Sequence, residues 1–392
     1  MNILINLASS EKDTKNPYHG GNEYCNVVSN NLILRNINKY KLIFYCNKKE
    51  TIDSKLLQII LDDEYSELVE GFNSYSIPDI IKQYRIQRIF DPMGVKLAQL
   101  SSRFNNIDFY YVIHGLRPIE MPTDLNEYFL GNKISFLLKS IFKKTFLKRK
   151  HDFYKRIVNL NSTNNNLIVV SEHTKYSISA EFSLKPDDIR VFYSPEKLNP
   201  NILKLDEDFF FKSEKRIVPN NYFLFLSAKR WQKNSFRTIK ALDELIDTNQ
   251  LKNKVVILGA NEKVNKLIKN REHFIILDYV NEKDLEVLYK NAFCLLYTSL
   301  NEGFGYPPLE AMKYGTPVIN SNISAIPEII ESSGLGFSPF STLELKARII
   351  QLQNDKNIYK ALINKGLNRY LEVKSRQEAD LADLCDYILT TN

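Results

Sequence analysis

The sequence has little cysteine and no long apolar run, and each absence argues against a class of protein. Its four cysteines among 392 residues form no Cys-x-x-Cys pair. We therefore expect reduced thiols, with neither a disulfide framework nor a zinc site. No apolar run reaches the roughly 18 residues of a membrane-spanning helix, and the first residues lack a signal-peptide pattern. These absences favour a cytoplasmic protein.

Two further features are missing. Neither half carries a Gly-x-Gly-x-x-Gly loop after its first apolar run, which disfavours a nicotinamide dinucleotide site. The formal net charge is only +7, too small an excess to indicate nucleic acid. Such a charge suits anionic ligands or a membrane-facing patch.

What is present is a repeated alternation of short apolar runs with longer amphipathic stretches. This alternation is typical of parallel α/β sheets, and 392 residues exceed the usual size of one core, so we expect two domains. A polar stretch at about 199–220 suits the link between them. The expected strands are Ile3–Leu7, Lys41–Tyr45, Arg88–Asp91, Phe109–Ile113, Leu167–Val170 and Arg190–Tyr193, then Tyr222–Leu226, Val255–Leu258, Phe274–Leu277, Phe293–Tyr297 and Pro317–Ile319.

The stretch 299–319 combines several signals of an anion-binding loop. After an expected strand come Gly303 and Gly305, and then a Pro-Pro pair that suits a helix start. Gly315 suits the end of that helix. Two acids bracket the seat, Glu302 before it and Glu310 in the expected first turn of the helix. Taken singly, these residues are also explained by a turn and by a helix dipole.

The combination resembles a known signature. Glu302 and Glu310 have the spacing of the E-x7-E motif of retaining, nucleotide-sugar-dependent glycosyltransferases of the family-4 type. The resemblance implies the GT-B fold, an α/β architecture of two Rossmann-like doubly wound domains facing across a cleft. Residues 1–205 would form the acceptor-side domain, with a C-terminal helix at about 375–392 packing back on it. Residues 206–374 would form the nucleotide-sugar domain.

The resemblance also implies roles for residues of the second half. Glu302 would bind the hydroxyls of the donor sugar and act as a catalytic residue, and Glu310 would bind the ribose. Lys233 and either Arg230 or Lys229 would contact the diphosphate, and this basic cluster is otherwise a solvated turn. The remaining implied contacts are Gly303, Phe304, Gly305 and Tyr306 at the diphosphate, and Tyr279 and Val280, which are equally well core residues, at the nucleotide.

The first half of the sequence matches the motifs of the family less clearly than the second half does. His114 ends an expected strand and resembles the sugar-contacting, catalytic histidine of the family, although Gly115 replaces the aspartate that usually follows. Ser171 begins a segment similar to a cleft-wall element of the family, and it equally suits a helix N-cap. An acceptor- and sugar-side loop is implied at Gly20, Gly21, Asn22 and Glu23, where a simple turn is the alternative.

Residues 133–156 form a basic amphipathic stretch. Apolar side chains recur at helical spacing from Ile134 to Phe146, and many lysines and arginines follow. Such a stretch can lie on an anionic membrane. A surface helix whose apolar stripe packs on its own domain explains it equally well.

The activity that the resemblance implies is transfer of a hexosyl-type sugar from a nucleotide-diphosphate sugar to a saccharide or lipid-linked acceptor, in bacterial surface polysaccharide assembly. No cofactor and no metal are expected, no nucleic acid partner is expected, and the protein would work at the inner face of the cytoplasmic membrane. An epimerase or phosphorylase on the same fold and a non-catalytic partner subunit are the alternatives. Glu302→Ala is expected to abolish transfer with folding intact.

Overall fold

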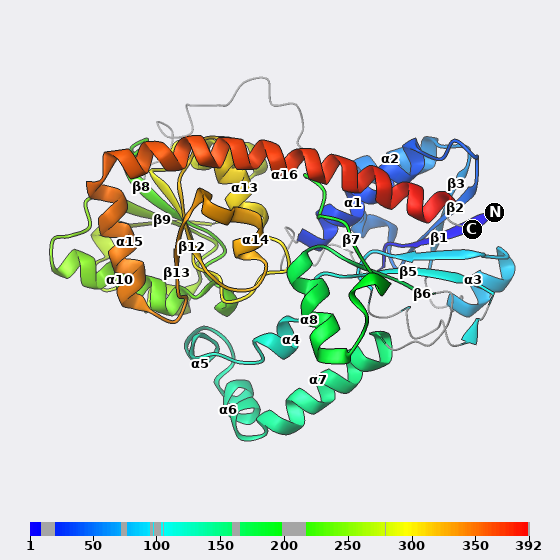
Figure 1. Cartoon of the computed structure of the whole chain (residues 1–392), viewed down its shortest axis with the longest axis horizontal. Coiled ribbons are helices and arrows are strands. Elements are labelled where there is room, and N and C mark those ends of the chain that lie inside the picture. The colour runs from blue at the N-terminus through cyan, green and yellow to red at the C-terminus, as the bar shows by residue number, and fades with distance from the viewer. Residues whose placement is uncertain are drawn as a thin grey trace. The chain divides into compact units, whose positions relative to one another are not determined.

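The computed structural model describes residues 1–8, 20–71, 77–94, 97, 103–104, 106–158, 165–197, 217–278 and 280–390. The chain groups into two compact units (Figure 1). The first unit comprises Met1–Leu116, Lys150–Asn199 and Lys374–Asn392, and the second comprises Arg117–Arg149 and Pro200–Val373. Each unit is an α/β structure with a parallel sheet, which confirms the expected fold class.

The sheet of the first unit has seven strands among the described residues, in the order β3-β2-β1-β4-β5-β6-β7 with every pair parallel. The strands are β1 Asn2–Asn6, β2 Lys41–Cys46, β3 Ser66–Glu70, β4 Arg88–Asp91, β5 Asp108–Ile113, β6 Asn165–Val169 and β7 Ile189–Val191. The helices of this unit are α1 Gly20–Leu34, η1 Lys49–Thr51, α2 Ser54–Asp62, α3 Ile77–Gln83, α8 Glu172–Phe182 and η3 Pro186–Asp188.

The sheet of the second unit has six strands among the described residues, in the order β10-β9-β8-β11-β12-β13, again all parallel. The strands are β8 Tyr222–Phe225, β9 Lys254–Leu258, β10 Phe274–Leu277, β11 Cys294–Tyr297, β12 Val318–Ser321 and β13 Leu335–Phe337. The helices are α4 Arg117–Glu120, α5 Leu125–Leu130, α6 Lys133–Ile141, η4 Trp231–Lys233, α10 Ser235–Asp247, α11 Glu262–Asn265, η5 Arg271–His273, α12 Glu282–Lys290, α13 Tyr306–Lys313, α14 Ile326–Ile330, η6 Glu331–Ser333 and α15 Thr342–Asn354.

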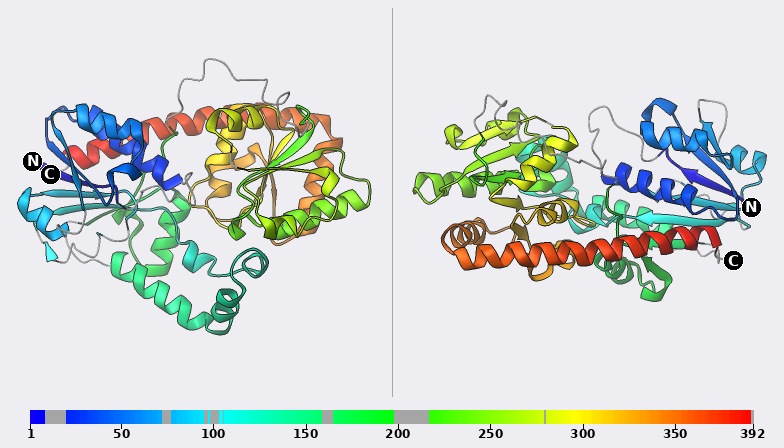
Figure 2. Two further views of the ribbon diagram at one scale, coloured as in Figure 1. Left: turned by 180° about the vertical axis from the view of Figure 1, so that it is seen from behind. Right: turned by 90° about the horizontal axis from the view of Figure 1, so that it is seen from above.

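Alternate residues of β8 explain why helices cover both faces of this sheet (Figure 2). Phe223 and Phe225 point to one face, where they share a core with α10 and α15. Tyr222 and Leu224 point to the other face, towards α12, α13 and α14. A strand buried on both sides reads as a continuous apolar run, which is why these strands are visible in the sequence.

The strands β3 and β13 were not predicted from the sequence, and each lies at the edge of its sheet. β3 is only partly buried and carries two glutamates, and β13 has three residues. An edge strand pairs on one side only and needs no long apolar run, so little in the sequence marks it.

Helix termini follow the expected signals in most places. Ser171 caps α8 by accepting a hydrogen bond from the N–H of Thr174, and α13 begins at the Pro-Pro pair. Gly315 follows α13 with φ +72°, a value that favours glycine. One expectation is wrong: α13 begins at Tyr306, so its first turn holds no acid and Glu310 lies in the second turn.

Two helices contribute residues to both units. α7 (Lys143–Val158) crosses the grouping at Arg149 and Lys150, and α16 (Lys356–Thr390) crosses it at Val373 and Lys374. The last part of α16 belongs to the first unit, where Arg88 Nη1 on β4 donates a hydrogen bond to the carbonyl of Ile388 (2.8 Å). The grouping differs from the division at residues 205 and 206 in one segment, because Arg117–Arg149 belongs to the second unit.

Both sheets share one topological feature. The order of strands reverses between β1 and β4 in the first unit and between β8 and β11 in the second. Helices leave in opposite directions at such a switch point, so the carboxyl ends of the two strands open a crevice where ligands bind in this class of sheet. The residues after β8 and β11 are therefore the first place to look for a site.

Candidate functional site

Two loops meet at the switch point of the second unit. The loop after β8 runs through η4 to α10, and the loop after β11 runs from Thr298 to α13. Hydrogen bonds join the loops: the N–H of Leu300 donates to the carbonyl of Gln232 (2.8 Å), and the Thr298 hydroxyl donates to the carbonyl of Lys233 (2.8 Å). The structure thus brings together the basic cluster and the glycine loop that the sequence analysis singled out separately.

A buried ion pair lies at the centre of these loops. Lys233 Nζ is 2.6 Å from Glu302 Oε1, and the two side chains are only 10% and 18% exposed. The ammonium group also lies 5.1 Å from the centroid of the Tyr297 ring, within range of a cation–π interaction. Lys233, expected to contact the diphosphate, and Glu302, expected to contact the sugar, thus form an ion pair with each other.

The pKa values of the pair follow from burial and charge. Burial alone would raise the pKa of Glu302, but the positive charges of Lys233 and Arg230 outweigh it and lower this pKa to about 2. Burial lowers the pKa of Lys233, while the Glu302 carboxylate acts in the opposite direction. Removing one partner would leave the other as an uncompensated buried charge. Glu302→Ala is therefore expected to affect folding as well as transfer, and Glu302→Gln is the milder test.

The positive potential at this site has further sources. Arg230, at the N-cap of η4, acts on the pKa values of both Lys233 and Glu302. Arg117 on α4 also acts on the pKa of Lys233. Arg230 and Lys229 were the alternatives for the second cation at the diphosphate, and the choice between them remains a prediction. Arg117 was missed, although its place just after the expected strand that ends at Ile113 was a signal that could have found it.

A hydrogen bond fixes α4 against the glycine loop. Asn301 Nδ2 donates to Glu120 Oε2 over 2.6 Å. Arg117 lies one helical turn before Glu120, so both can share a face of the short helix. The neighbour of Glu302 in the chain is thereby held by a segment more than 180 positions earlier.

The glycine loop leads directly into α13. Gly305 has φ +128°, and a Cβ built on it would meet only the Tyr297 ring, at 3.6 Å from its hydroxyl. Gly305 is also the N-cap of α13 and has no side chain that could cap the helix. Pro307 and Pro308 in the first turn have no N–H to donate, so the space beside Gly305, rather than the helix terminus, suits the close approach of a ligand. Phe304 is buried, and its ring meets that of Tyr306 edge to face (5.5 Å).

Two buried hydroxyl groups border the ion pair. The Ser299 hydroxyl helps to lower the pKa of Glu302. The Glu302 charge adds to burial in raising the pKa of Tyr297. Both side chains therefore belong to the surroundings of the ion pair, although the sequence marked them only as the end of a strand.

Glu310 lies on α13, and Val280 lies just before α12. The pKa of Tyr289 on α12 is raised well above its usual value by burial, and the charge of Glu310 adds to that effect. Val280 packs against the core that covers this face of the sheet, in line with the core role that was left open for it. Tyr279 lies outside the described residues. The nucleotide contacts of Glu310 and Val280 remain predictions.

The expected residues of the first unit have a different outcome. Gly20, Gly21, Asn22 and Glu23 form the first turn of α1, so these residues start a helix and do not form the expected loop. Their role on the acceptor and sugar side remains a prediction. An acid such as Glu23 in a first turn interacts favourably with the helix dipole. His114 follows β5, and its Nε2 lies 2.8 Å from the carbonyl of Pro92, which can only accept, so Nε2 carries the hydrogen. Its sugar contact remains a prediction.

The basic amphipathic stretch presents its apolar side to solvent. None of the residues of α6 is buried. The interpretation of a stripe packed on its own domain is therefore wrong for α6. The exposed apolar side chains are Ile134 (69% exposed), Leu137 (49%), Leu138 (51%), Ile141 (71%) and Phe142 (58%). We call these five residues the α6 patch.

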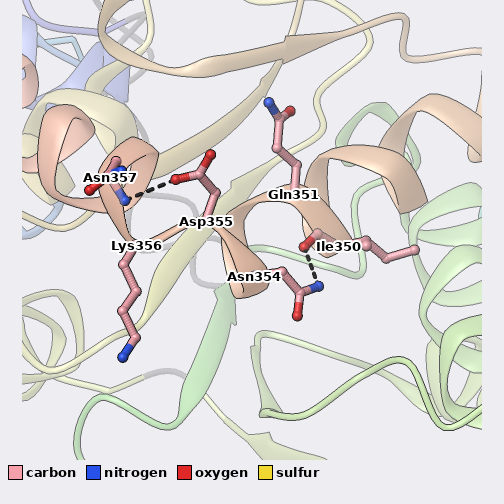
Figure 3. A pocket seen from close by; sticks show the side chains of 6 residues that line it. All are labelled: Ile350, Gln351, Asn354, Asp355, Lys356 and Asn357. Atoms are coloured by element: carbon pink, nitrogen blue, oxygen red, sulfur yellow. Dashed lines mark hydrogen bonds between the residues drawn. The ribbon is translucent and has the colours of Figure 1, made fainter.

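A surface hollow of about 510 Å³ lies elsewhere in the second unit, at the junction of α15 and α16 (Figure 3). Its polar groups are engaged in ending and starting these helices. Asp355 Oδ1 accepts from the N–H of Asn357 (2.9 Å), and Asn354 Nδ2 donates to the carbonyl of Ile350 (2.8 Å). The hollow is thus a helix junction rather than a continuation of the site around Lys233.

The described residues contain neither a membrane-spanning helix nor a cluster of metal-binding side chains. Within the described ranges, no helix is long and apolar enough to cross a membrane. No group of three or more histidine, cysteine, aspartate or glutamate side chains in the same ranges is placed to hold a metal ion.

Comparison with curated proteins gives partial matches. The chain is 30% identical over 179 residues to the O-antigen chain mannosyltransferase RfbU of Salmonella typhimurium, covering 44% of this chain and 46% of the relative. It is 27% identical over 205 residues to the O-antigen chain mannosyltransferase B of Escherichia coli, covering 48% and 54%. The chain thus spans about half the length of the curated relatives it matches.

Comparison with solved structures covers the whole chain. A glycosyltransferase from Rickettsia africae matches 100% of this chain and 99% of its own, with a TM-score of 0.65 at 17% identity. At such identity the match shows the fold alone, and this is the GT-B arrangement of two Rossmann-like units. Residues 206–369, which include Lys233, Glu302 and Glu310, match the family model described as glycosyl transferases group 1. Over that region, which is less than half of the chain, the sequence is similar to the glycosyl transferases group 1 family.

Proposed function

We propose that this chain is a retaining glycosyltransferase that moves a hexosyl group from a nucleotide-diphosphate sugar to a saccharide or a lipid-linked saccharide. The observation that carries the proposal is the buried Lys233–Glu302 pair at the switch point of the second unit. A charged pair is costly to bury, and one placed at a ligand crevice is better explained by binding than by stability.

Each part of a nucleotide-sugar donor has a complementary group in this unit. Lys233 and Arg230 are the proposed cations for the diphosphate, and the N–H groups of Gly303 and Gly305 in the preceding loop are the proposed further donors. Glu302, ionised at neutral pH, is an acceptor for sugar hydroxyls. Glu310 is proposed to accept from the ribose hydroxyls. No residue is assigned as a covalent nucleophile.

The proposed reaction exchanges one bond for another at the anomeric carbon. The bond from this carbon to the diphosphate oxygen breaks, and a bond to the acceptor oxygen forms on the same face of the sugar. The leaving phosphate takes the proton of the acceptor hydroxyl. Lys233 and Arg230 stabilise the negative charge that develops on the diphosphate, and preorganised charges of this kind supply a large share of catalysis in many enzymes. No metal is assigned a step.

The names of the relatives support a more specific donor. Several are mannosyltransferases of O-antigen chains, so we propose a nucleotide-diphosphate mannose as donor and surface polysaccharide assembly as the pathway class. The identity of the base is left to experiment. A thermal-shift screen against UDP, GDP, ADP, CMP and dTDP should show stabilisation by one of them, since a ligand that binds only the folded state raises its stability.

The α6 patch supports the proposal that the protein works at a membrane surface. Five exposed apolar side chains on one short segment are followed by the basic residues of α7, among them Lys143, Lys144, Lys148 and Arg149. Apolar side chains beside cations are complementary to an anionic lipid surface. We propose that this segment contacts the inner face of the cytoplasmic membrane, where a lipid-linked acceptor would be found.

The membrane contact has its own test. Leu137→Glu with Ile141→Glu should abolish sedimentation with phosphatidylglycerol vesicles, whereas Leu343→Glu, at an equally exposed leucine of α15, should not. Binding should be weaker in phosphatidylcholine vesicles and at high salt, because charges at a surface are screened. Equal sedimentation of all three proteins would contradict the contact.

The activity is tested by single-turnover assays with the nucleotide-diphosphate mannose whose nucleotide gives the shift. The expected result is acceptor-dependent release of the nucleoside diphosphate, with the anomeric configuration of the product retained. Release of an epimer or of free nucleotide without acceptor would indicate an epimerase instead. Nucleotide binding without turnover on any acceptor would indicate a non-catalytic subunit.

A further inference from the structure

A buried polar cluster joins α5 to the start of α10. It consists of Asp124, Asn126, Asn234 and Arg237, and we call it the α5 clamp. Asp124 accepts from Arg237 through both carboxylate oxygens, at 2.7 and 3.0 Å. Asn126 Nδ2 donates to Asn234 Oδ1 at 2.8 Å, and Asn126 is fully buried. The residues that meet are more than 100 positions apart in the chain.

Asn126 also completes the start of α10. The N–H of Phe236, in the first turn of that helix, donates to Asn126 Oδ1 at 2.9 Å. The N-cap residue of α10 is Asn234, whose own side chain makes no capping hydrogen bond. Asn126 therefore supplies from a distant segment the cap that helices normally take from the residue just before them. The Phe129 and Phe236 rings stack beside this contact at 4.1 Å.

The backbone at Asn234 has a conformation that few residues adopt. Its φ of 65° and ψ of 29° lie in the left-handed region, which asparagine enters more readily than most residues with a side chain. Its side chain is held at both ends, since Nδ2 donates to the carbonyl of Pro339 (2.7 Å) and Oδ1 accepts from Asn126. Lys233 directly precedes it, so the direction in which Lys233 leaves η4 depends on this turn.

The charges of the clamp are balanced internally. Burial alone would raise the pKa of Asp124, but hydrogen bonds from Arg237 and Asn126 lower it. The Asp124 and Arg237 side chains are 8% and 17% exposed. A bidentate, buried pair of this kind fixes orientation better than a single contact does. The clamp is thus a rigid support and leaves no net charge beside the site.

We propose that the α5 clamp is a positioning element of the donor site: it holds the Lys233–Asn234 turn so that the Lys233 ammonium group meets the donor diphosphate. The inference rests on the proposed function, because it takes the diphosphate as the ligand of Lys233. Asp124 and Asn126 act through Lys233 and touch no ligand themselves. Substrate binding by the second unit therefore depends on a segment outside residues 206–369.

The test compares Asn126→Ala with a control that loses a helix cap elsewhere in the same unit. Asp355 caps α16 by accepting from the N–H groups of Asn357 and Ile358, at the junction shown in Figure 3. Asn126→Ala and Asp355→Ala should both lower the unfolding free energy. In calorimetric titrations with UDP, GDP, ADP, CMP and dTDP, only Asn126→Ala should weaken binding of whichever nucleotide the wild type binds, by about tenfold.

Two further measurements separate positioning from general damage. Hydrogen exchange of the Phe236 amide should accelerate in Asn126→Ala and stay unchanged in Asp355→Ala. The conservative variant Asp124→Asn keeps the size of the side chain and one acceptor, so its effect on binding should be smaller, about threefold. If Asn126→Ala is too unstable to titrate, Asp124→Asn carries the test.

The outcomes are distinct. Equal nucleotide affinity of Asn126→Ala, Asp124→Asn and the wild type, with Lys233→Ala weakened, would overturn the clamp and leave the proposed function intact. Binding by the wild type of none of UDP, GDP, ADP, CMP and dTDP would overturn the donor assignment and this inference with it. Weaker binding by Asp355→Ala to the same degree as Asn126→Ala would show that only stability is involved.

Discussion

The two sheets have the same strand order but different chemistry at the switch point. In the second unit the crevice after β8 and β11 holds the Lys233–Glu302 pair. In the first unit the matching place, after β1 and β4, holds Asn6 and Asp91, with Asn6 Nδ2 donating to Asp91 Oδ1 at 3.2 Å. Topology provides a crevice in both units, and the side chains decide which one suits an anion.

The electrostatics of the two places are opposite in sign. Cations hold the pKa of Glu302 down to about 2. Burial raises the pKa of Asp91, which is 1% exposed, although hydrogen bonds from Asn6 and from the N–H groups of Leu97 and Met93 act against it. The cations that lower the pKa of Glu302 suit the diphosphate proposed for the second unit. Variants at both places can test that difference.

Lys233→Ala should produce the largest loss. Removing the central cation should lower the rate of sugar transfer by about 10²- to 10³-fold, the usual loss for one group that stabilises developing charge. Arg230→Ala should lower it more than Lys229→Ala does. Initial rates measured with saturating acceptor check this, and Lys240→Ala on the exposed face of α10 is the control. A normal rate for Lys233→Ala would remove the distinction between the two crevices.

Glu302→Gln should destabilise the protein by about 3 kcal/mol at pH 7, because Lys233 keeps its buried charge and loses its partner. The folded-state pKa of Glu302 is lowered, so its contribution is present above the ordinary value of 4.5 and is lost as the pH falls towards 2. The difference in unfolding free energy between Glu302→Gln and the wild type should therefore shrink over that range. Denaturant unfolding at pH 7, 5, 4 and 3 checks the trend. A constant difference would contradict the assigned pKa.

Two glycines that follow equivalent strands should respond differently to alanine. A Cβ on Gly94 after β4 would lie 2.1 Å from the Val112 carbonyl oxygen, so Gly94→Ala should cost about 3 kcal/mol or more in unfolding free energy. Gly305 after β11 has only the Tyr297 ring nearby, and its positive φ should cost Gly305→Ala about 1–2 kcal/mol. Nucleotide affinity should fall only in Gly305→Ala. Thermal unfolding and nucleotide titration together separate the two effects, and the opposite order of stabilities would refute this prediction.

Asp91→Asn should have the smallest effect, with a pH dependence opposite to that of Glu302→Gln. The folded-state pKa of Asp91 is raised, so its contribution is present below the ordinary value of 3.8 and is lost as the pH rises through the folded-state pKa. Removing the charge should leave the unfolding free energy at pH 7 unchanged or raise it slightly. Denaturant unfolding at pH 4 and pH 7 tests this. A clear loss at pH 7 would show that Asp91 carries a compensating partner.

Much of the fold was predictable because buried strands and helix ends are local signals. The apolar runs that begin at Tyr222 and Phe274 were predicted as strands and form β8 and β10. Ser171 caps α8 as expected. The loop from Gly20 to Glu23 was predicted wrongly because a Gly-Gly pair indicates a turn more often than a helix start. The edge strand β13 was missed because three residues carry no pattern.

Some features of the site are also local in the sequence, and others are not. The two acids, the glycine loop and the helix start after Gly305 could be predicted because neighbouring residues form them. The pairing of Lys233 with Glu302, 69 positions away, and the support of the turn after Lys233 by Asn126, over 100 positions away, became visible only in the folded chain. The exposure of the α6 patch to solvent also became visible only there. Burial and pairing depend on which distant segments pack together, and no local pattern of residues specifies that.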